Sequence, residues 1–214
     1  MKPVRGRVYL VDDDPDVRCS ITSVLDSVGY TISAYETAEE FLEEEISTQP
    51  HCLIADLLLP GMTGLQLCRQ MSVSNPACGF MIISGNADVA SAVEAIRMGA
   101  SDFLEKPFGR EKLLTSVHDA IKTVTARYRI RQEEDRTWAL FEKLTSRERD
   151  VFSMVAAGLP TKTIARSCGI STRTVDVHRS RILQKLQVES PTQLAHLIAI
   201  LDRLRAGRAG RAKA

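Results

Sequence analysis

The amino-acid sequence predicts an α/β domain followed by a small all-α domain. In the first half of the chain, five short apolar segments alternate with helical segments, and this order predicts a doubly wound parallel sheet with right-handed crossovers. The second half has four helical segments and little strand character. Residues 1–108 contain 7 Lys and Arg against 16 Asp and Glu, whereas residues 145–214 contain 13 against 5. The N-terminal part of the chain is therefore acidic and the C-terminal part basic. This asymmetry suggests a cation-binding or signalling module joined to a module that binds a polyanion such as nucleic acid.

Each predicted strand is a short apolar run that ends at a polar or turn-forming residue. The strands are expected at residues 8–11, 30–35, 52–56, 80–84 and 102–104. The helices between them are expected at residues 15–28, 38–45, 64–71 and 88–98. Asp14 is expected to cap the first helix, with Pro15 at the first helical position, which explains Asp14 more simply than a ligand role does.

A single long helical stretch is predicted after Gly109. Its first half is expected to be the last helix of the sheet domain, and its charged second half a solvated extension or a coiled-coil linker. The first domain is accordingly expected over residues 1–125 and the helical linker over residues 126–143.

The basic C-terminal region carries signals for four helices. Thr145 and Glu148 form a capping box that opens the first, and Ser171 is expected to cap the third. The second and third helices, joined by a turn with Gly169, predict a helix-turn-helix. This domain is expected over residues 144–206, with its last helix ending near residue 205, and the basic tail 207–214 is expected to be disordered.

Composition excludes several classes of protein. No apolar run approaches the roughly 18 residues that suggest a membrane helix, and the apolar run near the N-terminus is too short for a signal peptide. The five cysteines are scattered without a Cys-x-x-Cys pair, which argues against a zinc site or a disulfide framework. A cytoplasmic protein that makes no contact with membranes is therefore expected.

Polar residues follow four of the predicted strands at the same edge of the sheet. They are Asp12 and Asp13, Asp56, Ser84 and Lys106. Clustered carboxylates repel unless a cation neutralises them, and hard oxygen ligands at an open edge suit Mg²⁺. A hydroxyl and an ammonium group opposite are what a transferred phosphoryl group requires while a carboxylate attacks in line. The arrangement predicts an aspartyl phosphate, although Asp56 by itself could equally cap the turn before Pro60.

The motifs around these residues resemble the receiver domain of two-component response regulators. The matching stretches are Val-Asp-Asp-Asp-Pro at 11–15, Asp56 before Leu-Leu-Leu-Pro-Gly-Met-Thr-Gly, Ser-Gly-Asn-Ala-Asp at 84–88 and Glu-Lys-Pro-Phe at 105–108. The resemblance implies a flavodoxin-like fold and a phosphoacceptor, Asp56, that takes phosphate from a sensor histidine kinase. It also implies that Asp13, Asp56 and the Leu58 carbonyl bind Mg²⁺, with Asp12 helping through water.

The same resemblance gives roles to three residues on the far side of the site. Ser84 and Lys106 would hold phosphate oxygens, and Phe103 would be the aromatic switch, although a phenylalanine at such a position is more often part of the core. The Lys106–Pro107 peptide is expected to be cis. Leu58, Asn86 and Ala87 depart from the residues common in the family, and we hypothesise that they tune the lifetime of the phosphoryl group.

The helix-turn-helix region resembles the LuxR-type DNA-binding domain, and the whole chain resembles a response regulator of the FixJ/NarL type. By that likeness Lys162, Arg179 and Lys185 contact DNA phosphates, and Asp176, Val177 and Ser180 face the major groove. Asp176 could accept a hydrogen bond from cytosine N4, and Val177 could contact a thymine methyl group. The full set expected at double-stranded promoter DNA is Lys162, Arg173, Thr174, Asp176, Val177, Arg179, Ser180, Arg181 and Lys185.

The function expected from these patterns is that of a phosphorylation-activated transcriptional regulator and not of an enzyme. By the resemblance alone, phosphorylation would promote homodimerisation through the helix at 88–98 and the fifth strand. Binding of paired half-sites and contact with RNA polymerase would follow. One rival is a Mg²⁺-dependent aspartyl phosphatase that uses Asp12 and Asp14. Another is a DNA-binding protein whose first domain is a dimerisation scaffold that never takes phosphate.

Overall fold

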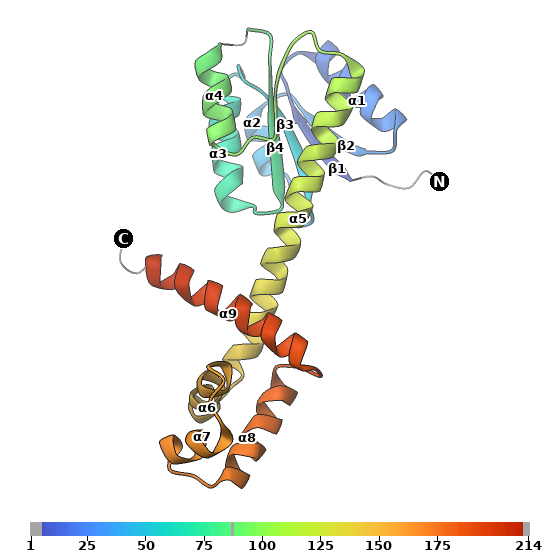
Figure 1. Ribbon diagram of the computed structural model, residues 1–214. Coiled ribbons are helices and arrows are strands. Elements are labelled where there is room, and N and C mark those ends of the chain that lie inside the picture. The colour runs from blue at the N-terminus through green and yellow to red at the C-terminus, as the bar shows by residue number, and fades with distance from the viewer. Residues whose placement is uncertain (1–5, 87, 212–214) are drawn as a thin grey trace. The chain divides into compact units, whose positions relative to one another are not determined.

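The structure is a computed structural model that describes residues 6–86 and 88–211. It divides into two compact units, residues 1–129 and residues 130–214, which are described separately (Figure 1). Across the described part of the chain, no helix is long and apolar enough to cross a membrane.

The first unit is built on a single sheet of parallel strands in the order β2-β1-β3-β4-β5. The strands are β1 (Arg7–Val11), β2 (Thr31–Tyr35), β3 (His51–Asp56), β4 (Cys78–Ser84) and β5 (Phe103–Glu105). Every residue of β3 and β4 is buried. This burial explains why the sequences of both strands are largely continuous apolar runs. The predicted doubly wound, flavodoxin-like sheet is confirmed.

Helices cover both faces of this sheet (Figure 1). Their bounds are α1 (Pro15–Ser27), α2 (Ala38–Glu43), α3 (Gly64–Ser74), α4 (Val89–Arg97) and α5 (Arg110–Glu142). One core packs α2, α3 and α4 against inward residues such as Leu53, and the opposite core packs α1 and the start of α5 against residues such as Ile54. The alternation of neighbouring β3 residues between two cores follows from the period of two in a strand.

Helix α4 forms where the helical spacing predicts it, but its large apolar side chains lie outside the core. Val89, Val93 and Ile96 are 81%, 42% and 52% exposed, whereas Ala95 is fully buried. Periodicity identified the helix without showing that this apolar face lacks a partner within the unit. Three neighbouring exposed aliphatic side chains suggest a surface that another protein can cover.

The second unit contains the end of α5 and four further helices. These are α6 (Ser146–Ala156), α7 (Thr161–Cys168), α8 (Thr172–Lys185) and α9 (Pro191–Arg211). Thr145 caps α6 in the predicted capping box with Glu148, and Ser171 caps α8. Buried Phe152 and Leu201 belong to the shared core of these helices.

Two expectations for this part of the chain are corrected. The charged second half of the long helix was expected to be a solvated extension or a coiled-coil linker over residues 126–143. At its end it is not solvated, because the side chains of Thr137, Leu140 and Phe141 are buried, and Leu140 and Phe141 join the core of the second unit. The tail expected to be disordered from residue 207 is helical as far as Arg211, although Gly207 and Gly210 are poor helix formers. Residues 212–214 lie outside the described residues.

Gly64 allows α3 to begin against the strand that carries Asp56. A β-carbon at this position would lie 2.1 Å from the Asp56 carbonyl oxygen, so Gly64→Ala must displace backbone. We expect the free energy of unfolding to fall by about 1–3 kcal/mol in urea titrations, the usual cost of overpacking. Gly109→Ala, which meets nothing within 4 Å, is the control. An unchanged urea midpoint for Gly64→Ala would contradict the packing described.

Candidate functional site

The predicted polar residues meet at the carboxyl ends of the parallel strands. Asp12 follows β1, Asp56 ends β3, Ser84 ends β4 and Lys106 follows β5. The strand order places β1, β3, β4 and β5 side by side, so their ends form one edge. Asp12, Asp56 and Ser84 are buried although they are polar. Buried polar groups at one sheet edge are typical of a binding or reaction site.

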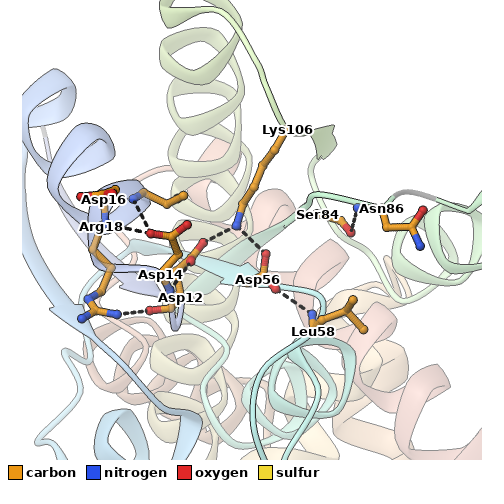
Figure 2. A network of polar contacts seen from close by, with 10 residues as sticks. Asp12, Asp14, Asp16, Arg18, Asp56, Leu58, Ser84, Asn86 and Lys106 are labelled. Atoms are coloured by element: carbon orange, nitrogen blue, oxygen red, sulfur yellow. Dashed lines mark hydrogen bonds and ion pairs between the residues drawn. The ribbon is translucent and has the colours of Figure 1, made fainter.

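Lys106 joins the two buried carboxylates (Figure 2). Its Nζ lies 2.7 Å from Asp12 Oδ2 and 2.7 Å from Asp56 Oδ1. The other Asp56 oxygen accepts a hydrogen bond of 2.8 Å from the main-chain N–H of Leu58, and the other Asp12 oxygen accepts one of 3.0 Å from Asp14. Asp56 therefore does not merely cap a turn, because one oxygen serves the turn and the other faces an ammonium group.

The protonation equilibria reflect this burial. Desolvation raises the pKa of Asp12 above its ordinary value, although hydrogen bonds from Lys106 and Asp14 oppose the shift. Burial by itself would lower the pKa of Lys106, but its hydrogen bonds to Asp12 and Asp56 outweigh that effect and raise the pKa. Lys106 therefore stays charged at neutral pH, as a group that neutralises anionic oxygens must.

Ser84 is bonded to Lys106 through the main chain, where the Lys106 N–H donates to the Ser84 carbonyl oxygen at 2.7 Å. In Figure 2 its side chain lies on the other side of Asp56 from Asp12. Its hydroxyl oxygen accepts a hydrogen bond of 3.2 Å from the main-chain N–H of Asn86. Phe103 at the start of β5 is partly buried and packs against the core that contains α4. The Lys106–Pro107 peptide is cis, as predicted. Ala87 lies outside the described residues.

The acidic residues after β1 separate into different roles. Asp14 caps α1 as predicted, because its side chain accepts hydrogen bonds from the main-chain N–H groups of Asp16 and Val17. Asp13 is exposed. Over residues 6–86 and 88–211, no three His, Cys, Asp or Glu side chains are grouped as a ready-made metal site. The ammonium group of Lys106 bridges Asp12 and Asp56 in this structure.

The donor chemistry nevertheless fits a divalent cation. Two buried carboxylates share a single ammonium group, so the site carries excess negative charge when both are ionised. Carboxylate and carbonyl oxygens are the ligands that Mg²⁺ prefers.

The second unit presents a helix-turn-helix. Helices α7 and α8 pack against each other, and Gly169 joins them in the left-handed conformation with φ of 65°. Val175 and Ile182 of α8 are buried in the core. The opposite face of α8 carries a surface groove lined by Arg173, Asp176, Val177, Ser180, Arg181 and Gln184. A helix that offers such a polar and basic face is suited to the major groove of DNA.

The remaining residues expected at DNA differ in their surroundings. Lys162 is exposed at the start of α7, and Arg179 Nη1 donates to the Thr161 hydroxyl oxygen at 3.2 Å. Thr174 is partly buried near the start of α8, where its main-chain N–H donates to Ser171.

Lys185, which was also expected at DNA, forms an ion pair within the second unit. Its Nζ lies 2.6 Å from Oε2 of the buried Glu148, so it neutralises a core carboxylate. The expected contact of Lys185 with DNA stays a prediction, to which the structure adds this ion pair. The capping-box pattern identified Glu148 at the sequence level but could not show its partner 37 residues away.

Replacing Lys185 with methionine is expected to destabilise the second unit by about 1–3 kcal/mol, because Glu148 would be left buried without its cation. Burial opposes the ionisation of Glu148, but hydrogen bonds from Lys185 and Thr145 prevail and hold its pKa below the ordinary value. A lowered folded-state pKa stabilises the fold fully above the unfolded value of about 4.3, and this contribution is lost as pH falls further. Urea titrations at pH 7 and pH 3 should show the difference from wild type shrinking at pH 3. Lys162→Met is the control, and equal losses in both variants would contradict the assignment.

Two family descriptions match the chain. Residues 8–118 match the response regulator receiver domain, and residues 142–198 match the bacterial regulatory proteins of the luxR family. The chain therefore belongs to the response regulators that join a receiver domain to a luxR-type DNA-binding domain. It is a phosphorylation-dependent, DNA-binding transcriptional regulator of a two-component system.

The chain is similar to other regulators over most of its length. The transcriptional regulatory protein FixJ of Bradyrhizobium diazoefficiens is 34% identical over 90% of this chain and 94% of its own length. Nodulation protein W of the same organism is 36% identical over 92% of this chain and 86% of its own length. The solved structure of the response regulator StyR superposes with a TM-score of 0.83 at 35% identity, covering 91% of this chain and 98% of StyR.

Proposed function

We propose that Asp56 accepts a phosphoryl group from a sensor histidine kinase and that this modification controls promoter binding by α8. The observation that carries the proposal is the ammonium group of Lys106, held 2.7 Å from Asp56 at the carboxyl end of the sheet. A carboxylate oxygen that a lysine contacts in this way is placed to attack phosphorus while the lysine neutralises the oxygens of the transferred group.

The chemistry is a transfer between two nucleophiles. An Asp56 carboxylate oxygen forms the new bond to phosphorus as the phosphorus–nitrogen bond of the kinase phosphohistidine breaks, and the histidine leaves with its electron pair. Lys106 and Ser84 hold the phosphoryl oxygens. Mg²⁺ would be held by Asp13, Asp56 and the Leu58 carbonyl, with Asp12 helping through water, and would supply further neutralising charge. Hydrolysis of the acyl phosphate at the same site resets the regulator, which otherwise has no catalytic role.

Dimerisation is proposed to link the site to DNA. Phosphoryl contact at Ser84 would rearrange β4 and Phe103, and Phe103 packs against the core that contains α4. The exposed Val89, Val93 and Ile96 of α4 are suited to the dimer contact with β5. Two copies of α8 would then reach paired half-sites of promoter DNA, where RNA polymerase is recruited.

Incubation with acetyl phosphate and Mg²⁺ tests the proposal. Intact-mass measurement and peptide mapping should find one phosphoryl group on Asp56 of the wild type and none on Asp56→Asn. Absence of any phosphoryl adduct on the wild type would favour the scaffold alternative, and turnover of added phosphoesters would favour the phosphatase.

Leu58→Asn is expected to shorten the phosphoryl lifetime. The Leu58 side chain is 62% exposed, and its main-chain N–H is bonded to Asp56, so the side chain borders the approach of water to the acyl phosphate. A side chain that can orient water should speed hydrolysis by about tenfold, at the lower edge of the usual gain from a positioned polar group. The loss of phosphate after removal of acetyl phosphate measures the rate. Val73→Asn, at an exposed position on α3, is the control, and an unchanged rate in Leu58→Asn refutes the idea.

A further inference from the structure

Arg18 on α1 contacts the main chain beside the acidic site (Figure 2). Its Nη1 donates a hydrogen bond of 2.6 Å to the carbonyl oxygen of Asp12. Its Nη2 lies 3.7 Å from Oε2 of Glu36, the residue after β2. The Arg18 side chain is 20% exposed, so its guanidinium group is held between α1 and the carboxyl ends of β1 and β2.

The other polar groups of Asp12 also form hydrogen bonds. Its main-chain N–H donates to the Tyr35 carbonyl at 3.2 Å, and its two carboxylate oxygens accept from Asp14 N–H and Lys106. The carbonyl that Arg18 contacts belongs to the peptide unit that leads to Asp13. Because a peptide unit is planar, holding its oxygen fixes its plane and hence the direction in which the chain enters Asp13.

Asp13 depends on this constraint more than its neighbours do. Its side chain is exposed, whereas that of Asp12 is buried and bonded at both oxygens. The backbone fixes the direction of the Cα–Cβ bond from which an exposed carboxylate extends. At Asp13 that backbone is set on one side by the Asp14 cap of α1 and on the other by the Asp12 carbonyl.

We propose that Arg18 is a positioning residue: through the Asp12 carbonyl it orients the Asp13 carboxylate toward the divalent cation. This inference rests on the Mg²⁺ site of the proposed function and extends it to a residue that contacts neither the cation nor the phosphoryl group. Partners that orient metal ligands from outside the ligand set commonly contribute about 10- to 100-fold to metal affinity.

The sign of the effect separates positioning from simple charge. A guanidinium group beside acidic ligands repels another cation, so its charge alone would weaken Mg²⁺ binding, and removal of that charge would strengthen it. Positioning predicts the opposite, because removal releases the Asp12–Asp13 peptide. The direction of change in Mg²⁺ affinity is therefore informative whatever its size.

The experiment is calorimetric titration of the full-length protein with MgCl₂ alone. Arg18→Met keeps the aliphatic stem and is expected to bind Mg²⁺ about tenfold more weakly than wild type. Arg18→Lys keeps a donor and should recover part of the loss. Arg69→Met, which removes an exposed arginine paired with Glu94 on α4, is the matched control and should bind as wild type does.

Urea titrations establish that each variant is folded under the conditions of the calorimetry. Should Arg18→Met fail to fold, Arg18→Lys carries the test, with an expected Mg²⁺ affinity below that of wild type by less than about tenfold. Equal or tighter binding by the Arg18 variants, with wild type binding normally, overturns the inference and leaves the proposed function intact. Failure of wild type to bind Mg²⁺ overturns the proposed metal site, and the inference with it.

Discussion

Lys106→Met is expected to slow phosphoryl incorporation at Asp56 by about 100-fold, the effect of removing one preorganised electrostatic donor. The ammonium group contacts both buried carboxylates at 2.7 Å in the resting protein. Without it, the two carboxylates of Asp12 and Asp56 lose the cation that lies between them. The transferred phosphoryl group also loses the cation that balances its oxygens.

The same substitution should alter the pH dependence of stability. The raised pKa of Asp12 means that its ionisation costs stability in the fold, and Lys106 offsets that cost. Lys106→Met should therefore be most destabilised relative to wild type at neutral pH. The deficit should shrink as pH falls to about 4, where carboxyl groups take up protons.

Rates of incorporation from acetyl phosphate and urea titrations at several pH values measure these effects. Lys112→Met is the control, because Lys112 pairs with Asp102 at the same distance of 2.7 Å but is 57% exposed. An incorporation rate in Lys106→Met within about twofold of wild type would contradict a role in electrostatic stabilisation.

Asp176→Ala is expected to change which DNA sequences the protein selects. Asp176 and Val177 line the groove on the outward face of α8, and a carboxylate there can accept from cytosine N4. Loss of one such base contact should reduce discrimination at one base pair by about 1–3 kcal/mol, or roughly 5- to 150-fold. The affinity for DNA as a whole should not fall, since removal of a negative charge favours approach to phosphates.

Selection from a random DNA library with phosphorylated wild type and Asp176→Ala measures this preference. Lys162→Met is the comparison, because loss of a phosphate contact should weaken binding to all sequences and reduce the salt slope by about one. Identical selected sequences for wild type and Asp176→Ala would remove Asp176 from base recognition.

Local patterns in the sequence predicted most of the fold. The strands were identifiable because apolar runs stop at acids, glycines or prolines, and the caps at Asp14, Thr145 and Ser171 form as predicted. Parallel strands then bring Asp12, Asp56, Ser84 and Lys106 to one edge without any further assumption. The Lys106–Pro107 cis peptide came from family resemblance and not from the local pattern.

The remaining features depend on contacts between distant parts of the chain. Periodicity cannot reveal that the apolar residues of α4 face outward or that Leu140 and Phe141 enter the second core. A basic residue on a predicted recognition helix likewise suggests a DNA contact. The sequence does not show that one such residue, Lys185, forms an ion pair with Glu148. Arg18 carried no sequence signal, because its partner is a main-chain carbonyl and not a side chain.

Genome-wide occupancy of DNA by wild type and Asp56→Asn tests the central claim most directly. Both proteins would be expressed at equal levels in cells in which the cognate kinase is active. Wild type is expected to occupy a defined set of promoters, and Asp56→Asn is expected to lose most of that occupancy while remaining folded. Equal occupancy by the two proteins would contradict control of DNA binding by phosphorylation of Asp56.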